Sequence, residues 1–370
     1  MRIPPDKNLH VDQPTLFIDE KIVRENIRRM AAKAIQSNVL FRPHFKTHQS
    51  ETIAEWFRDY GCTAITVSSF EMAYYFGEKY WHDVTIAIPV NVLQIKDINI
   101  LAKKIRLNVV VDNSMTAQIL VDSVKFSLGV FIKTDTGNKR CGIPADHIAD
   151  MVDLCKIISK SSLLKFKGIL SHSGHTYNAN NIQEIRQIYR HDCNALQNVQ
   201  MSLNVFADEH CMISIGDTPG CCLADFIWSD EIRPGNFVFN DLFQWHLGVC
   251  KPEDIACVMS CPVIGVYPER NEFVIYGGAV HFSKDFLTYN SEKIYGCMAI
   301  PDRDGELHIS PENALVKIWQ EHGLIRASDE IIPTVKPGDI VHIYPVHSCL
   351  TMHAMRNIFT TEGEKILAMS

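Results

Sequence analysis

The sequence predicts an α/β fold: a (β/α)8 barrel of the TIM type, followed by a second, mostly β domain. Eight short runs rich in β-branched residues alternate with longer amphipathic segments between about residues 20 and 245. This alternation is typical of a parallel sheet, and eight such units are the number that closes a barrel. After residue 250 the helical pattern gives way to strand-like runs with turn signals. We therefore assign residues 14–250 to the barrel and residues 251–370 to the second domain.

The expected barrel strands are runs of Val, Ile, Leu and Phe at 38–46, 64–69, 83–90, 106–113, 127–137, 166–174, 212–219 and 231–239. Helical patterns are clearest at 19–36, 145–160 and 181–199, with Asp19, Ser114 and Asn181 at expected N-cap positions. The same alternation would also suit an open, doubly wound sheet. A glycine-rich dinucleotide-binding fingerprint after the first strand would favour that alternative, and the sequence has none.

The second domain should consist mainly of strands, drawn from 257–283, 305–310 and 338–348. The N-terminal segment TLFIDE (15–20) either pairs with this domain or leads into the barrel. Residues 1–13 are candidates to join the second domain as well.

Composition excludes several classes of protein. Lys and Arg number 36 against 43 Asp and Glu, a formal charge of −7, so we expect no nucleic-acid partner and no attraction to anionic membranes. No apolar run approaches the roughly 18 residues of a membrane span, and the start lacks the apolar core of a signal peptide. The 12 cysteines are irregularly spaced without a CxxC pair, which favours reduced core residues in a cytoplasmic protein.

Polar residues follow nearly every expected barrel strand, at the end where such barrels carry their active sites. A solvated loop would explain any one of them, but it explains the whole set poorly. The set comprises Arg42, His44, Lys46, Thr47, His48, Ser68, Ser69, Asp112, Asn113, Asp135, Thr136, Gly137, Arg140, His172, Ser173, His175, Tyr177, Gly216, Asp217, Thr218, Arg233, Gly235 and Asn236.

Lys46, in RPHFKTH (42–48), is the most informative of these residues. Burial at a strand end, with Arg42, His44 and His48 nearby, would favour the neutral amine that forms a Schiff base. A lysine that extends to the barrel rim is the alternative. The turns IGDTPG (215–220) and RPGN (233–236) offer backbone N–H groups for a phosphate, and together with a reactive lysine they predict pyridoxal phosphate.

A second cluster lies in PVHSCLTMH (345–353), which contains His347, Cys349 and His353. In an extended segment residues i and i+2 point to the same side, so His347 and Cys349 could bind one metal. Thiolate and imidazole ligands favour Zn²⁺, with other divalent metals as alternatives. A buried cysteine beside a surface histidine is the simpler explanation of the same pattern.

RPHFKTH, DTGNKRCG (135–142), GHTY (174–177), EIRPGNFVFND (231–241) and HSC (347–349) together resemble fold-type III pyridoxal-phosphate enzymes with an alanine-racemase-like barrel. Within that group the chain is most similar to the D-serine dehydratase / D-threonine aldolase family, from Pro14 to about residue 353. The resemblance implies that Lys46 forms the Schiff base and that Arg140 binds the cofactor's phenolate oxygen. Contacts to the phosphate would come from Tyr177, Thr218, Gly235 and Asn236. His347 and Cys349 would bind a divalent metal that takes the substrate hydroxyl, and the chain would form a homodimer.

The resemblance implies a lyase that uses pyridoxal phosphate and a metal to act on D-3-hydroxyamino acids such as D-serine, D-threonine or 3-hydroxyaspartate. We favour β-elimination to a keto acid and ammonia, with Lys46 taking the Cα proton, because D-threonine aldolases tend to carry aspartate where Cys349 stands. Retro-aldol cleavage to glycine and an aldehyde, with His44 or His48 as the base, is the alternative. An amino-acid racemase would leave HSC without a role, and a non-catalytic cofactor carrier would leave the second domain unexplained.

Overall fold

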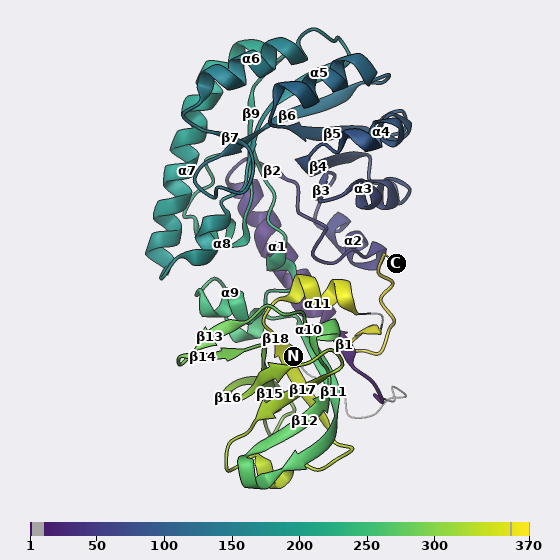
Figure 1. Cartoon of the computed structure of the whole chain (residues 1–370), viewed down its shortest axis with the longest axis vertical. Coiled ribbons are helices and arrows are strands. Elements are labelled where there is room, and N and C mark those ends of the chain that lie inside the picture. Colours follow the sequence, from purple (N-terminus) through teal and green to yellow (C-terminus); the bar gives the residue numbers. More distant parts are fainter. Residues whose placement is uncertain (2–10, 356, 370) are drawn as a thin grey trace.

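The computed structural model describes residues 1, 11–355 and 357–369 and consists of two units arranged along its long axis (Figure 1). The upper unit is a parallel barrel whose strands follow the order β2-β10-β9-β8-β6-β5-β4-β3. A parallel bridge between His44 and Thr66 joins the segment after β2 to β3 and closes the ring. The predicted (β/α)8 barrel is therefore confirmed, and the open doubly wound sheet is excluded.

The barrel strands form because their residues are buried on both faces, so nearly continuous apolar runs are required. In β5 only the first residue is exposed, and in β6 only the last is not fully buried. The strands are β2 (Leu40–Phe41), β3 (Ile65–Val67), β4 (Asp83–Pro89), β5 (Arg106–Val111), β6 (Leu128–Asp135), β8 (Leu164–Ser171), β9 (Met212–Ile215) and β10 (Glu231–Ile232), with β7 (Ile143–Pro144) paired to β6.

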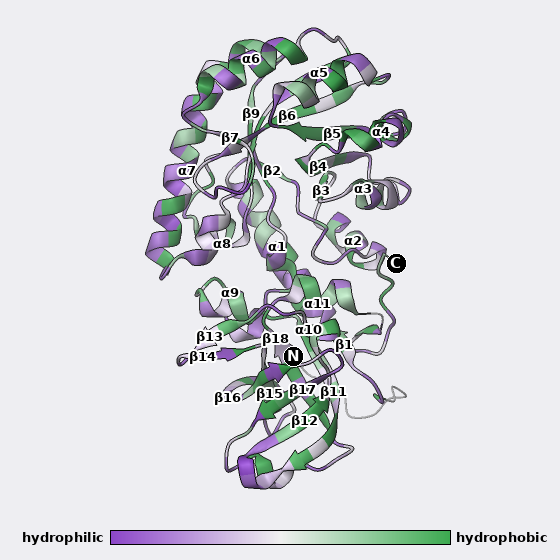
Figure 2. Ribbon diagram, in the orientation of Figure 1, coloured by the Kyte–Doolittle hydropathy of each residue, from purple (hydrophilic) through white to green (hydrophobic). Residues whose placement is uncertain are grey.

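Helices cover the outside of the barrel, and Figure 2 shows hydrophilic residues along them and mainly hydrophobic residues in the strands. Asp19 and Asn181 cap α1 and α7 as predicted, but Asn113 rather than Ser114 caps α5, accepting from the Thr116 backbone N–H at 2.8 Å. The helices are α1 (Glu20–Gln36), α2 (Glu51–Arg58), α3 (Phe70–Gly77), α4 (Ile95–Ala102), α5 (Ser114–Ser123), α6 (Ile148–Ile158), α7 (Ile182–Leu203) and α8 (Thr218–Leu223).

The lower unit is an antiparallel β domain, as predicted. Six strands follow the order β12-β17-β16-β15-β18-β11, and β11 pairs back with β12, so they close a second, smaller barrel. They are β11 (Cys257–Tyr267), β12 (Glu272–Tyr276), β15 (Gly296–Pro301), β16 (Leu307–Ile318), β17 (His322–Arg326) and β18 (Ile340–Pro345). A separate hairpin consists of β13 (Leu287–Tyr289) and β14 (Glu292–Ile294).

The first strand of the chain belongs to the β domain and also leads into the barrel. β1 (Thr15–Ile18) is fully buried between β11, to which it is antiparallel, and β19 (Ile358–Thr360), to which it is parallel. Its last residue is followed by Asp19, the N-cap of α1. Of the segment predicted as a candidate to join this domain, residues 2–10 lie outside the described residues, whereas the Met1 carbonyl accepts a hydrogen bond from the Leu307 backbone at 3.0 Å.

Three short helices lie at the junction of the two units: α9 (Leu242–His246), α10 (Ala279–Phe282) and α11 (Ser348–Ala354) (Figure 1). The three helices at the junction all come from the second half of the chain. The C-terminal segment returns to the barrel, where the Ser50 hydroxyl donates to the Leu367 carbonyl at 2.7 Å.

Among the described residues, none of the helices has the length and apolar character that a membrane span would need.

Candidate active site

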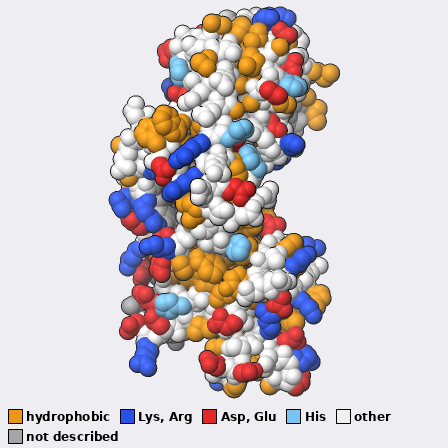
Figure 3. Space-filling model, turned by 90° about the vertical axis from the view of Figure 1, so that its left-hand side faces the viewer, with side chains coloured by type: hydrophobic (Ala, Val, Ile, Leu, Met, Phe, Trp, Pro, Cys, Tyr) orange, Lys and Arg blue, Asp and Glu red, His pale blue; other side chains and the backbone are white. Residues whose placement is uncertain are grey.

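A cavity of about 470 Å³ lies at the C-terminal ends of the barrel strands, where the barrel meets the β domain. On the face drawn in Figure 3, hydrophobic side chains gather just below this junction. The cavity wall includes every predicted site residue except His48: His44, Lys46, Arg140, Tyr177, Thr218, Gly235 and Asn236 from the barrel, and His347 and Cys349 from the β domain. Residues predicted from separate motifs therefore meet in one place.

His48 points away from the cavity into an aromatic cluster. Its ring centroid lies 4.4 Å from that of Phe45 and 5.6 Å from that of Phe57, and the side chain is inaccessible to solvent. Nδ1 accepts a hydrogen bond from the Ser50 backbone at 3.1 Å, and burial lowers the pKa of His48 to about 3. The structure does not bring His48 to the reacting groups, because residues 45–48 form a turn rather than an extended segment, so His48 does not point to the side that His44 and Lys46 share.

Lys46 reaches into the cavity with an exposed side chain, so the burial that we expected for its amine is not found. Of its three expected cationic neighbours only His44 lies beside it, with Nδ1 3.4 Å from the Lys46 backbone N. Burial, followed by the charge of Lys46, lowers the pKa of His44 well below its ordinary value, so that imidazole is neutral. The buried lysine is instead Lys133, 3% exposed, whose pKa burial lowers to about 7.

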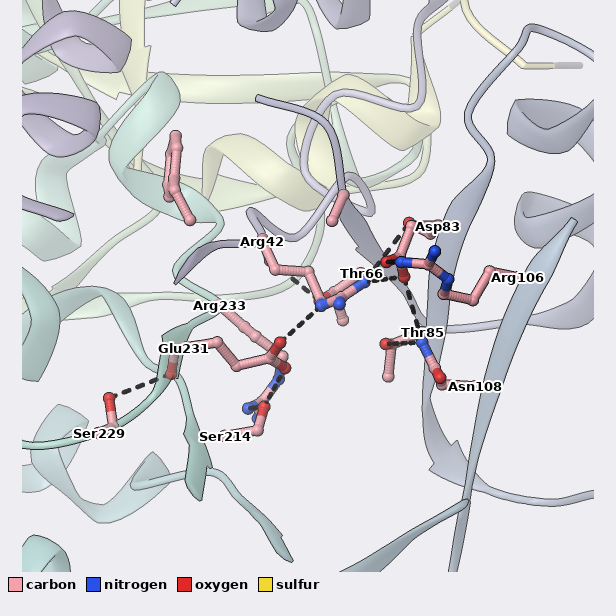
Figure 4. A network of polar contacts seen from close by, with 12 residues as sticks. Arg42, Thr66, Asp83, Thr85, Arg106, Asn108, Ser214, Ser229, Glu231 and Arg233 are labelled. Carbon is pink, nitrogen blue, oxygen red and sulfur yellow. Dashed lines mark hydrogen bonds and ion pairs between the residues drawn. The ribbon is translucent and has the colours of Figure 1, made fainter. Parts of the chain in front are cut away.

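Arg42, the second expected neighbour of Lys46, is a buried ion-pair residue of the barrel interior (Figure 4). Its Nε donates to Glu231 Oε2 at 2.7 Å and its Nη1 donates to Asp83 Oδ1 at 2.6 Å. Glu231 also accepts from the Ser214 hydroxyl at 2.5 Å, and that hydroxyl accepts from Arg233. The network thus extends from Asp83 across the barrel to Arg233, which lines the cavity.

The predicted phosphate contacts come together where three turns meet. Tyr177 lies in the turn 174–178, Thr218 begins α8, and Gly235 precedes the turn 236–238. The Thr218 backbone N–H donates to the Tyr177 hydroxyl at 3.4 Å, and burial raises the pKa of Tyr177, which keeps the phenol protonated. A Cβ atom on Gly235 would lie 2.8 Å from Thr47 Oγ1. Glycine is therefore required for this close approach, as in a backbone cradle for an anion.

The buried side chain of Asp217 supports this cradle. Asp217 caps α8 by accepting from the Gly220 backbone at 2.5 Å, and its Oδ2 also accepts from the Thr176 hydroxyl at 2.9 Å. Asp217 thereby ties together the turns that carry Tyr177 and Thr218. Burial, assisted by the charge of Asp192, raises the pKa of Asp217 to about 7.

The predicted metal ligands are adjacent, although not for the reason expected. β18 ends at Pro345, so His347 and Cys349 lie at the start of α11 rather than in an extended segment. The Cys349 thiol hydrogen-bonds to His347 and donates to Thr47 Oγ1 at 3.4 Å. Burial opposes ionisation of Cys349, but the hydrogen bond and charge of His347 outweigh it and lower the pKa of the thiol. His353 lies apart, with Nδ1 3.0 Å from the Gln49 amide nitrogen.

Asn236 connects the cradle to the metal-ligand pair. Its Nδ2 donates to Asp241 Oδ2 at 2.7 Å and to Ser348 Oγ at 3.1 Å, and it lies 3.5 Å from the Cys349 sulfur. The side chain therefore faces α11, so the phosphate contact that we predicted for Asn236 would have to come from its backbone N–H. The Asn236 amide thus joins the barrel to α11 of the β domain.

Two family models match the chain over consecutive ranges. Residues 18–242, more than half of the chain, match the alanine racemase N-terminal domain, and residues 256–361 match the putative serine dehydratase domain. The chain belongs to the alanine racemase N-terminal domain family. The resemblance inferred from the motifs is thereby confirmed.

Relatives of this alanine-racemase-type protein match it along nearly its whole length. The D-serine dehydratase of Dictyostelium discoideum is 28% identical over 92% of this chain and 91% of the relative. The D-threo-3-hydroxyaspartate dehydratase of Delftia sp. (strain HT23) is 25% identical over 94% of this chain and 93% of the relative. A solved structure of a D-threo-3-hydroxyaspartate dehydratase variant in the metal-free form has a TM-score of 0.89 at 24% identity and covers 99% of both chains, so the two share the fold.

The alanine-racemase-type barrel presents groups that fit pyridoxal phosphate. Lys46 supplies an accessible amine, Gly235 and its neighbours supply the cradle, and Arg140 supplies a cation in the same cavity. The donors of His347 and Cys349 are a nitrogen and a sulfur, which suit zinc. Among the described residues no group of three or more His, Cys, Asp or Glu side chains could hold a metal, so this pair would bind an ion with only two protein ligands.

Sequence reasoning missed several residues of the cavity wall. His172 and Arg233 were among the polar strand ends but were given no role; the buried Arg233 donates to the Ser171 carbonyl at 2.6 Å. Lys284 and Asp285 lie in the loop between α10 and β13 and were not foreseen at all. The strand-like run that we expected over 257–283 ends inside their segment, HFSKDF (281–286), and nothing local signals that Asp285 contacts His347.

Proposed function

We propose that this chain is a lyase that uses pyridoxal phosphate and zinc to remove water from D-3-hydroxyamino acids, giving a keto acid and ammonia. The observation that carries the proposal is that one cavity contains an accessible lysine amine from the barrel and an imidazole–thiol pair from the β domain. The curated relatives, which are named as dehydratases of D-serine and D-threo-3-hydroxyaspartate, support the same class of substrate.

When bound, pyridoxal phosphate withdraws electrons from the substrate Cα, and zinc acts as a Lewis acid toward the β-hydroxyl. The chain's own residues hold and move the protons. Lys46 lines the cavity with an exposed side chain, and its amine would take the proton from Cα. Arg140, in the same wall, would stabilise negative charge on the cofactor's phenolate oxygen, and the protonated Tyr177 hydroxyl would donate to its phosphate.

The sulfur donor of Cys349 and the burial of His48 favour elimination over aldol cleavage. Aldol cleavage needs a base for the hydroxyl proton, and His48 is too far inside the aromatic cluster to act as one. The neutral His44 remains as a candidate base beside Lys46. The soft sulfur of Cys349 suits zinc, which assists the departure of hydroxide.

The decisive experiment is product analysis of the purified, cofactor-loaded protein with D-serine and D-threonine. Dehydration of D-serine gives pyruvate and ammonia, whereas aldol cleavage of D-threonine gives glycine and acetaldehyde. EDTA should abolish dehydration and added zinc should restore it. Cys349→Ala should lose zinc and activity while keeping the cofactor's visible absorbance. The matched control is Cys222→Ala, at a half-buried cysteine outside the cavity, and it should keep zinc, activity and absorbance. A Cys349→Ala protein with normal zinc and the parent rate would overturn the proposal.

We further propose that the enzyme is a cytoplasmic homodimer. All 12 cysteines are free, and most are buried, which supports a reducing compartment. The dimer rests on the family resemblance alone. Light scattering coupled to size-exclusion chromatography measures the mass directly, and a monomeric mass would refute the dimer.

A further inference from the structure

We propose that Asp285 positions His347 for metal binding, so that the loop 283–286 is a working part of the zinc site without supplying a ligand. The inference rests on the proposed function above and adds a residue to it. Asp285 lies between α10 and β13, on the β-domain side of the cavity. Its Oδ2 is 2.5 Å from Nδ1 of His347.

The contact decides which nitrogen of His347 is available. An imidazole has two ring nitrogens, and the partner of one sets the protonation of the other. Because Nδ1 is held by the carboxylate, Nε2 is left as the nitrogen that can bind a metal. A carboxylate in this position fixes the ring orientation and makes the imidazole a stronger ligand.

The loop is built so that Asp285 faces α11. Ser283, which follows α10, has φ +75° and ψ −179°, a region occupied almost only by glycine. A strained residue of this kind persists only where its surroundings hold it. Its hydroxyl accepts from the Asp285 backbone N–H at 3.1 Å, and Thr351 of α11 donates to the Phe282 carbonyl at 3.4 Å. These contacts attach the loop to the helix that carries the metal-ligand pair.

Asp285 is a positioning residue and not a third ligand. At 2.5 Å from Nδ1, its Oδ2 leaves no room for an ion between the two atoms. In the described part of the chain, no cluster of three or more potential ligands exists at this site or elsewhere. The contact is therefore a direct hydrogen bond that orients His347.

The test compares Asp285→Asn and Asp285→Ala with the matched control Asp302→Asn. Asp302 also pairs with a histidine, its Oδ2 lying 3.0 Å from Nε2 of His308, but it is not in the cavity wall. Zinc affinity of the cofactor-loaded proteins is measured by competition with a chromophoric chelator, independently of activity. We expect zinc binding to weaken about 10- to 100-fold in Asp285→Ala, less in Asp285→Asn, and not at all in Asp302→Asn. Cofactor absorbance and melting temperature should stay unchanged in all three.

Each outcome has a separate meaning. Wild-type zinc affinity in both Asp285 variants would overturn the positioning role while leaving the proposed function intact. A parent protein that binds no zinc would overturn the metal part of the proposed function and this inference with it. If Asp285→Ala lowers the melting temperature, the zinc affinity of the nearly isosteric Asp285→Asn is the measurement that tests the positioning role. Restoration of dehydration by excess zinc in either variant would show that affinity, and not the chemical step, was lost.

Discussion

Removal of Arg42 should destabilise the protein far more than removal of a neighbouring arginine that binds the same carboxylate. The Arg42 guanidinium is buried and pairs with Glu231, which is inaccessible to solvent, and with Asp83 (Figure 4). Arg42→Met would leave a fully buried carboxylate without its cation, which costs about 3–5 kcal/mol of the free energy of unfolding. Arg106 also contacts Asp83, at 3.1 Å, but its side chain is 73% exposed, so Arg106→Met should cost less than about 1 kcal/mol.

Urea unfolding at pH 7, followed by tryptophan fluorescence and circular dichroism, measures both variants. The double variant Arg42→Met/Glu231→Gln removes the stranded charge and should recover part of the loss, because the two residues are coupled. If Arg42→Met stays within about 1 kcal/mol of the parent, the two carboxylates are not held by this cation, and the account of the barrel interior is wrong.

Three further predictions concern the cavity. Because the pKa of Asp217 is raised from 3.8 to about 7, the folded state binds its proton more tightly than the unfolded state, so wild-type stability falls as the pH rises from about 4 to about 7. In urea titrations, the free energy of unfolding of Asp217→Asn should equal that of the parent at pH 4 and exceed it by up to about 4 kcal/mol at pH 8. A variant that is less stable than the parent at pH 8 would contradict this prediction. Lys46→Ala should lose the cofactor's visible absorbance on dialysis, whereas Lys284→Ala, a lysine of the same cavity wall, should keep it. Arg140→Ala should retain the cofactor but change its absorbance spectrum and lower turnover; an unchanged spectrum and rate would remove Arg140 from the site.

The sequence was informative where local composition and motif carry the information. Strands buried on both faces need continuous apolar runs, so all eight barrel strands could be located. Inference from the sequence failed where tertiary structure determines which of two nearby residues takes a given role. Asn113 and Ser114 are both good caps, and only the path of the chain selects the first. His44 and His48 flank the same lysine, yet the turn after β2 sends one to the cavity and the other to the core.

Burial and long-range pairing were the hardest features to infer. Lys46 and Lys133 both lie near strand ends, and the structure buries the second rather than the first. Asp285 and His347 are separated by 62 residues, and no motif links them. Such pairs arise from how the β domain packs onto the barrel, which has no signature in a single segment of sequence.

The position of β1 has a consequence for biosynthesis. This strand is made before both of its partners, β11 and β19, which lie more than 230 residues later in the chain. While the barrel emerges from the ribosome, the apolar side chains of Leu16, Phe17 and Ile18 have no sheet to enter and remain available for other contacts. Completion of the β domain then requires the insertion of β1 between β11 and β19, a closure of high contact order that is expected to be slow. Proteins shortened at the C-terminus before β19 would leave one edge of that strand open to pairing with another chain.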